Sequence, residues 1–270
     1  MRIISVGHAV FALAILGLAA FSLVTGYFDS NWPPVPSWIT WREYFSYAVM
    51  LLMCAIGIGL LARQTAALAS LVLAVLMLIW LLVLEVPRPF TVPHAAIADA
   101  WAGLGEKSMI IAGAWILYAT LASQGDRPYL KYLAGEQGVR IAQILFALAL
   151  LLSGQENFVY VKNTASLIPA WFPYRLGWAY LSGAGMVAAG LVLLFGALPR
   201  LAAILVASMM SVFTLLVWVY LTAKTPATLD NWAGIFISSS LSGAAWIVAE
   251  SYRSASWFSR KKSRASSTAT

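Results

Sequence analysis

An internal repeat is the feature that most constrains how this chain can fold. When residues 35–61 are aligned without a gap to residues 168–194, nine of the 27 positions are identical. At this offset of 133 the identities are Pro36/Pro169, Trp38/Trp171, Arg42/Arg175, Tyr47/Tyr180, Met53/Met186, Ala55/Ala188, Gly57/Gly190, Leu60/Leu193 and Leu61/Leu194. A second block, at an offset of 131, pairs Asp99-Ala100-Trp101-Ala102-Gly103 with Asp230-Asn231-Trp232-Ala233-Gly234. The chain therefore consists of two copies of one unit.

The composition predicts that both copies lie in a membrane. Hydrophobic residues make up 61% of the chain and charged residues only 10%, whereas soluble globular proteins carry about 25% charged residues. The formal net charge is +7, but the basic residues are scattered between apolar runs or gathered at the C-terminal end. Because no basic face could follow a phosphate backbone, we expect the lipid bilayer as a partner and no nucleic acid.

Eight apolar runs are candidates for transmembrane helices, since about 20 residues cross a hydrocarbon core of about 30 Å, and the fifth run is short. We place them at residues 3–25, 41–62, 66–86, 104–122, 139–153, 174–197, 201–222 and 232–250. The predicted fold is all-α, with eight transmembrane helices that form two parallel, pseudo-symmetric four-helix bundles. The units are 1–124 for the first copy, 125–138 for a cytoplasmic linker, 139–250 for the second copy and 251–270 for a basic, disordered cytoplasmic tail.

Two local features concern the helix starts. A cleaved signal peptide is the alternative for the first run, because Arg2 precedes it and Leu18-Ala19-Ala20 resembles a cleavage region. The repeat favours retention of this helix, since cleavage would leave the first copy one helix short. Thr40 and Glu43 have the spacing of a capping box, which predicts that they open the second helix.

The distribution of basic residues predicts the orientation. One side of the eight helices carries eleven Lys and Arg residues, and the other side carries six. Because cytoplasmic loops are enriched in Lys and Arg, we expect both termini in the cytoplasm.

Three stretches of the second copy carry a resemblance to a known family. They are Gly154-Gln155-Glu156-Asn157-Phe158, Ile168-Pro169-Ala170-Trp171-Phe172-Pro173 and Trp178-Ala179-Tyr180-Leu181-Ser182-Gly183. The sequence resembles the DoxX-like family of four-helix bacterial membrane proteins, here as a tandem pair, with Asn157 where the family pattern has a histidine. The resemblance covers most of 139–249 and, more faintly, 35–118. It implies a bacterial inner-membrane protein, and some members are similar to subunits of quinone-linked sulfur oxidoreductases or accompany oxidative-stress enzymes.

Charged and aromatic residues that recur in both copies are the candidates for a ligand site. Arg42 and Arg175 occupy equivalent helix starts, where snorkelling to lipid headgroups is the alternative. Asp99 and Asp230 lie near the start of the last helix of each copy, where helix capping is the alternative. The aromatic pairs, for which an interfacial belt is the alternative to stacking on a quinone, are Trp38/Trp171 and Trp101/Trp232.

Carboxylates at predicted helix ends complete the candidate set. Glu156, with Asn157, ends the fifth helix, and Glu85 ends the third. Because carboxylates at a membrane edge are costly without partners, Arg175 is expected beside Glu156 and Arg88 beside Glu85. By the predicted topology these groups gather into one polar-rimmed vestibule per copy on the outer side, and the second vestibule is the better candidate.

The sequence contains no pattern typical of a catalytic or metal site. His8 and His94 have no nearby Cys or carboxylate at ligand spacing. Cys54 is the only cysteine and lies in an apolar run, where a small buried side chain is the simplest interpretation. We expect no catalytic residue, no metal and no cofactor, with quinone as the one exception left open.

Two functions follow as hypotheses. The first is a non-catalytic membrane subunit or scaffold of a redox or stress-response system, which contacts a membrane redox partner protein and a quinone. The second is a binder or transporter of a small apolar or anionic molecule at the outer side of the membrane. The scarcity of ionisable residues near the predicted midplane weighs against ion-coupled transport.

Overall fold

The structure is a computed structural model that describes residues 5–28, 39–122 and 133–255, and every regular element in these ranges is a helix. Eight helices are long: α1 (Val6–Thr25), α2 (Arg42–Leu61), α3 (Ala66–Trp80), α5 (Ile97–Ala122), α6 (Gly135–Gly154), α9 (Arg175–Phe195), α10 (Pro199–Phe213) and α12 (Leu229–Ser251). The short ones are η1 (Leu81–Glu85), α4 (Arg88–Thr91), η2 (His94–Ala96), α7 (Glu156–Val159), α8 (Val161–Leu167), η4 (Thr214–Val219) and α11 (Tyr220–Lys224). Trp38 and residues 256–270 of the predicted tail lie outside the described residues.

Seven helical segments within the described residues are long and apolar enough to cross a membrane. They are Val6–Thr25, Arg42–Leu61, Ala66–Thr91, Gly135–Val159, Arg175–Phe195, Pro199–Lys224 and Leu229–Ser251. The remaining long helix, α5, has 26 residues but carries Glu106 and Lys107, and it is not one of the seven. The chain is therefore a helical, multi-pass membrane protein.

The helix bounds of the two copies recur at the offset of the repeat. α3 and α10 are both 15 residues long and begin 133 residues apart, and a π-helix follows each, η1 and η4. Equivalent glycines also make equivalent close contacts. A Cβ on Gly57 would lie 2.7 Å from Leu16 Cβ, and one on Gly190 would lie 2.9 Å from Leu151 Cδ2.

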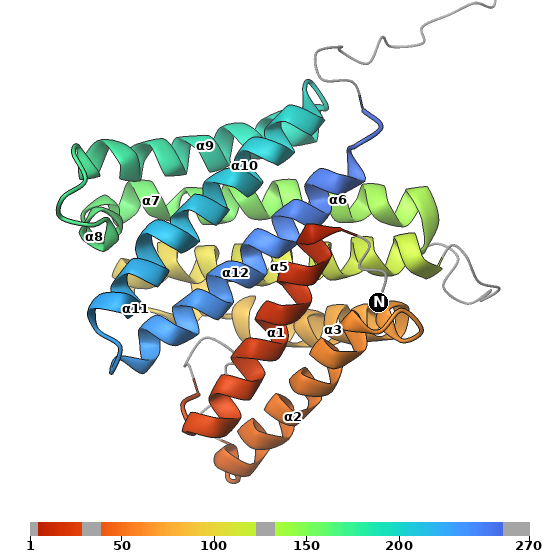
Figure 1. Cartoon of the computed structure of the whole chain (residues 1–270). Helices are drawn as coiled ribbons and strands as arrows, with labels where there is room; N and C mark the ends of the chain where they lie inside the picture. Colours follow the sequence, from red (N-terminus) through yellow and green to blue (C-terminus); the bar gives the residue numbers. More distant parts are fainter. Residues whose placement is uncertain (1–4, 29–38, 123–132, 256–270) are drawn as a thin grey trace, which may run out of the picture.

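The two copies interleave in a single bundle. The first helix of each copy packs against the last helix of the other: α1 lies against α12, and α6 lies against α5 (Figure 1). Small residues permit the close approach, since a Cβ on Gly243 would lie 2.6 Å from the Phe11 backbone nitrogen. α5 and α12 also contact each other. The packing thus joins the copies, since these two contacts are more extensive than the contact between the first and last helices within either copy.

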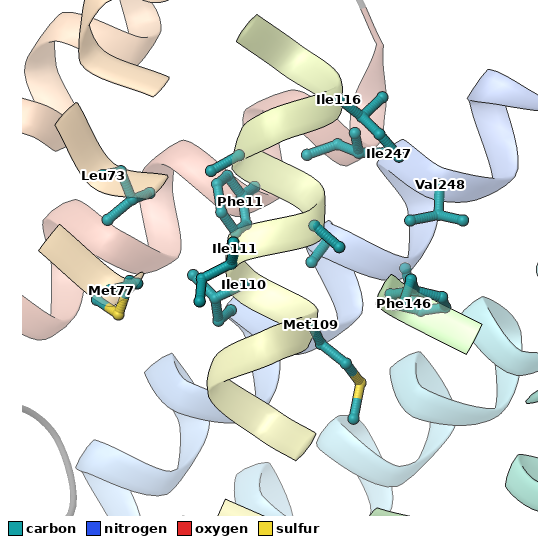
Figure 2. Packing of buried hydrophobic residues seen from close by; sticks show 14 of the residues in the cluster. Phe11, Leu73, Met77, Met109, Ile110, Ile111, Ile116, Phe146, Ile247 and Val248 are labelled. Carbon is teal, nitrogen blue, oxygen red and sulfur yellow. The ribbon is translucent and has the colours of Figure 1, made fainter. Parts of the chain in front are cut away.

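α5 forms the centre of the core. Seventeen of its 26 residues are buried, and Figure 2 shows Met109, Ile110 and Ile111 of this helix among apolar side chains of its neighbours. The outer helices instead expose large apolar side chains, such as Leu51 on α2 and Leu205 on α10. α5 therefore buries Lys107 together with apolar residues, and a buried cation needs a partner of opposite charge.

The bundle has two distinct ends. At the terminal end lie Ser5, Leu133 and Ala255, and the turns that join α2 to α3 and α9 to α10. At the opposite end, which we call the loop end, lie α4, α7, α8 and α11. Figure 1 shows α8 and α11 far from the N-terminus. All of the described candidate residues lie at the loop end.

Several predicted helix starts are wrong by a few residues. Trp41 precedes α2 and no side chain caps the helix, so the capping box of Thr40 and Glu43 does not form. α5 begins at Ile97 and not at 104, because the run after Pro93 consists largely of alanine and other good helix formers. α6 begins at Gly135, inside the predicted linker, with Glu136 in its first turn, where an acid complements the helix dipole.

Candidate functional site

Glu85 is the centre of a buried group of charges at the loop end of the first copy. It is the last residue of η1 and is fully buried. Its Oε2 accepts a hydrogen bond from Arg88 Nη1 at 2.9 Å, which confirms the predicted pair. Its Oε1 lies 3.0 Å from Lys107 Nζ of α5, an ion pair that lacks hydrogen-bond alignment. The Lys107 side chain is also buried, with 2% exposed.

Arg88 extends this group to a second carboxylate. Its Nη2 donates to Asp99 Oδ2 at 3.0 Å, so one guanidinium bridges Glu85 and Asp99. Gly103 provides the space, because a Cβ there would lie 3.1 Å from Glu85 Oε2 and 3.2 Å from Arg88 Nη1. We call Glu85, Arg88, Asp99 and Lys107 the charged network.

The charged network has no net charge, and its side chains differ in their exposure to solvent. Two cations face two carboxylates, and the side chains of Glu85 and Lys107 are almost completely buried. The Arg88 side chain is 28% exposed and the Asp99 side chain 52%. Since desolvating two ions costs several kcal/mol for each ion, the inner pair depends on its close geometry. The outer pair leaves part of the guanidinium accessible from the loop end.

The recurring aspartates have different partners in the two copies. Asp99 and Asp230 both lie in the first turn of their helices. Asp99 pairs with Arg88, whereas Asp230 accepts a hydrogen bond from the Tyr27 hydroxyl. Both therefore bind side chains from other elements, in addition to lying where they complement a helix dipole.

The recurring tryptophans lie beside these aspartates. The Trp101 ring makes an edge contact with Phe90 of α4, with ring centroids 6.5 Å apart. Trp232 donates from Nε1 to the Pro226 carbonyl oxygen at 3.0 Å. Trp171 is 63% exposed and contacts Phe172.

The two recurring arginines do not join the charged network. Arg42 and Arg175 are the first residues of α2 and α9 and are exposed. Among the described residues neither arginine forms an ion pair. This position suits an arginine that reaches toward lipid headgroups or recruits an anion.

The predicted pairing of Glu156 with Arg175 is wrong for the described residues. Glu156 is half-buried at the start of α7 and interacts electrostatically with two acids of α5, Asp99 and Glu106. Asn157 Oδ1 accepts a hydrogen bond from Thr164 Oγ1 at 3.1 Å. The pairing fails because α7 packs further along α9, where Asn157 lies against Gly183, eight residues after Arg175. The predicted vestibule of the second copy is therefore not assembled around an ion pair.

The equivalent place in the second copy is uncharged. Ser238 is the counterpart of Lys107 at the offset of 131, and its hydroxyl lies 2.7 Å from that of Thr214 on η4. Trp218, the counterpart of Glu85 at the offset of 133, lies over Gly234, where a Cβ would be 2.1 Å from ring atom Cε3. A hydroxyl pair and an aromatic ring thus occupy the place of the charged network.

No family model, curated protein or solved structure matches this chain. The site is thus interpreted from its own geometry, and the DoxX-like resemblance remains a proposal.

Sequence reasoning missed Lys107, the second cation of the charged network. The signal was available, because Lys107 lies four residues after Gly103 and eight after Asp99, on one helix face. A lysine in an apolar helix is costly without a partner, and Glu85 was already a candidate. Among the described residues no group of three or more His, Cys, Asp or Glu side chains could hold a metal ion.

Proposed function

We propose that this chain is a DoxX-like, non-catalytic membrane subunit of a bacterial redox or stress-response system. In this proposal the charged network is its contact point for a quinone headgroup. The observation that carries the proposal is the ion pair of Glu85 and Lys107, which is buried between two helices of a membrane protein. Buried charges in such helices are expensive and usually mark a functional site.

The outer part of the charged network supports a quinone headgroup as the ligand. A quinone carbonyl oxygen accepts hydrogen bonds, and the partly exposed guanidinium of Arg88 can donate them. Phe90 lies two residues after Arg88 on α4, Trp101 lies on α5, and the two rings supply aromatic surface nearby. Glu85 would fix the position of the guanidinium, and Lys107 would fix the position of Glu85. The burial of both side chains would exclude water from this side of Arg88.

The membrane topology is part of the proposal. We infer eight crossings with α5 as the eighth, both termini in the cytoplasm, the bacterial inner membrane as the location, and an axis of pseudo-symmetry along the membrane normal. The recurrence of helix bounds and of glycine contacts in the two copies supports this arrangement. The basic residues also favour the cytoplasm for the terminal end.

Thiol labelling tests the orientation. On a background that carries Cys54→Ser, Ser166→Cys at the loop end should react with a membrane-impermeant reagent in intact cells. Gln64→Cys at the terminal end should react only after permeabilisation. The reverse pattern would contradict the proposed orientation.

Quinone retention tests the functional part. Protein purified in mild detergent should carry a quinone detectable by native mass spectrometry, and Arg88→Ala should lose most of it. Arg42→Ala is the matched control, since Arg42 is an exposed arginine at the same end and lies outside the charged network. Equal retention in both variants would exclude the charged network as the quinone site, and a partner enzyme that co-purifies would still identify the redox system.

A binder or transporter of a small anion is the second candidate. The exposed arginines Arg42 and Arg175, which have no ion pair among the described residues, favour it. Flux of an anionic solute into proteoliposomes should then fall in both arginine variants and remain normal in Arg88→Ala.

A further inference from the structure

A cavity of about 1040 Å³ opens at the terminal end, away from the charged network. Its apolar wall comes from α5, α6, α9 and α12 and includes Ile116, Leu193 and Ile247. Sites for small organic ligands usually measure about 300–1,000 Å³. Of the candidate site residues that the structure describes, none lines this cavity, so it is a separate feature of the molecule.

Comparison with the first copy explains why the cavity is open. The sequence Phe-Ala-Leu-Ala occurs at 11–14 and at 146–149, which makes Gln143 the counterpart of His8. His8 is buried and its Nε2 lies 2.8 Å from the Leu60 carbonyl oxygen, so it ties α1 to α2. Gln143 Nε2 instead donates to Ser251 Oγ of α12 at 2.9 Å. Leu193, the counterpart of Leu60, is therefore left lining the cavity.

Two hydrogen-bond donors in the cavity have no partner among the described residues. Arg140 is exposed and forms no ion pair with them. The Tyr252 hydroxyl makes no hydrogen bond with them, and burial raises the pKa of Tyr252 to about 12, although Arg140 opposes this rise. The phenol is therefore neutral at physiological pH and can donate a hydrogen bond.

The acids of the cavity are few and partly neutralised. Glu136 lies in the first turn of α6, where the helix dipole favours a carboxylate. Glu250 pairs with Arg253 at 3.2 Å. Arg140 is thus a cation that is available to an anionic group.

The cavity also borders the lipid-facing surface. Phe195 is 82% exposed and Ile144 47% exposed, and both residues line it. An acyl chain could enter from the side while a headgroup stays at the end of the bundle, where basic pockets between membrane helices suit anionic headgroups.

We propose that this cavity binds one acidic phospholipid, with an acyl chain against the apolar wall and the phosphate group at Arg140 and Tyr252. The proposal is independent of the quinone site, because it concerns the other end of the bundle and different residues.

Lipid titration followed by native mass spectrometry tests this binding on the full-length protein. Phosphatidylglycerol should bind about tenfold more tightly than phosphatidylcholine, because both phosphates can accept a hydrogen bond from Arg140 but the choline cation of phosphatidylcholine repels the guanidinium. Arg140→Gln should remove this preference. Arg63→Gln is the matched control, because Arg63 is an exposed arginine at the same end and does not line the cavity.

A second variant tests the cavity without changing a charge. Gln143→His should let an imidazole reach the Leu193 carbonyl oxygen as His8 reaches that of Leu60, and so weaken the binding of both lipids. Three results would each overturn the proposal: equal affinity for the two lipids, an equal loss of phosphatidylglycerol in Arg63→Gln, or binding of glycerol phosphate as tight as that of the intact lipid.

Discussion

The first copy buries a pair of charges at the place where the second copy has a hydroxyl pair and a tryptophan. Glu85 and Lys107 occupy this place in the first copy, between a π-helix and the last helix of the unit. Thr214 and Ser238 bridge the corresponding helices in the second copy, and Trp218 fills the space above Gly234. The second copy thus has uncharged residues at the sequence positions that are equivalent to those of the two charges. This difference is what makes the charged network a candidate for function.

The largest expected effect on stability comes from removing one charge of the buried pair, which leaves the other charge without this partner. Lys107→Met should lower the free energy of unfolding by about 3–5 kcal/mol, because Glu85 would stay buried without its inner partner. Ser238→Ala, the equivalent change in the second copy, should cost only about 1 kcal/mol, since it removes a neutral hydrogen bond. Unfolding of both variants in the same detergent measures the contrast. Similar losses would mean that the inner pair is not an essential ion pair.

When a methyl group is added instead, the second copy should lose more stability than the first. Gly234→Ala places a Cβ 2.1 Å from a rigid Trp218 ring atom and should cost about 1–3 kcal/mol, as overpacking does. Gly103→Ala meets only the ends of two flexible side chains, at 3.1 and 3.2 Å, and should cost less. Thermal denaturation of the two single variants compares them directly. A larger loss for Gly103→Ala would show that the charged network is more rigid than the tryptophan contact.

The smallest effect on stability should come from removing both inner charges together. Replacement of a buried ion pair by apolar residues of similar size is often neutral or stabilising, so Glu85→Met with Lys107→Met should change the free energy of unfolding by less than about 1 kcal/mol. The same protein should retain less quinone if the inner pair positions Arg88. Normal retention together with normal stability would reduce the inner pair to a dispensable feature of the fold.

Local sequence determined much of the helical structure. The apolar runs predicted the membrane class and the approximate positions of the long helices. Glu85 and Arg88 were paired correctly from sequence because a carboxylate at a membrane edge needs a partner, and Arg88 lies only three positions further along the chain. Helix starts were less predictable, since Thr40 and Glu43 had the right spacing for a capping box but Trp41 precedes the helix without a side-chain cap.

Candidate residues far apart in the sequence were predicted less well. Arg175 and Glu156 were expected to pair by charge alone, but α7 packs against Gly183, about two helical turns along α9 from Arg175. Asp99 was recognised as a recurring residue, yet its contact with Arg88 depends on how α4 lies against α5. The cavity at the terminal end was not predicted from the sequence, because its walls come from four helices that are far apart along the chain.

The sequence by itself determined that the chain is a multi-pass helical protein, because the apolar composition and the length of the apolar runs are properties of the chain alone. Its internal repeat predicts two related copies. Only the tertiary structure decided that α1 packs on α12 and α6 on α5, and that Lys107 reaches Glu85 across 22 residues of chain. The physical reason is that any apolar helix can bury its surface against several others. Close contacts such as that of Gly243 with Phe11 select one arrangement, and they exist only after the helices have met.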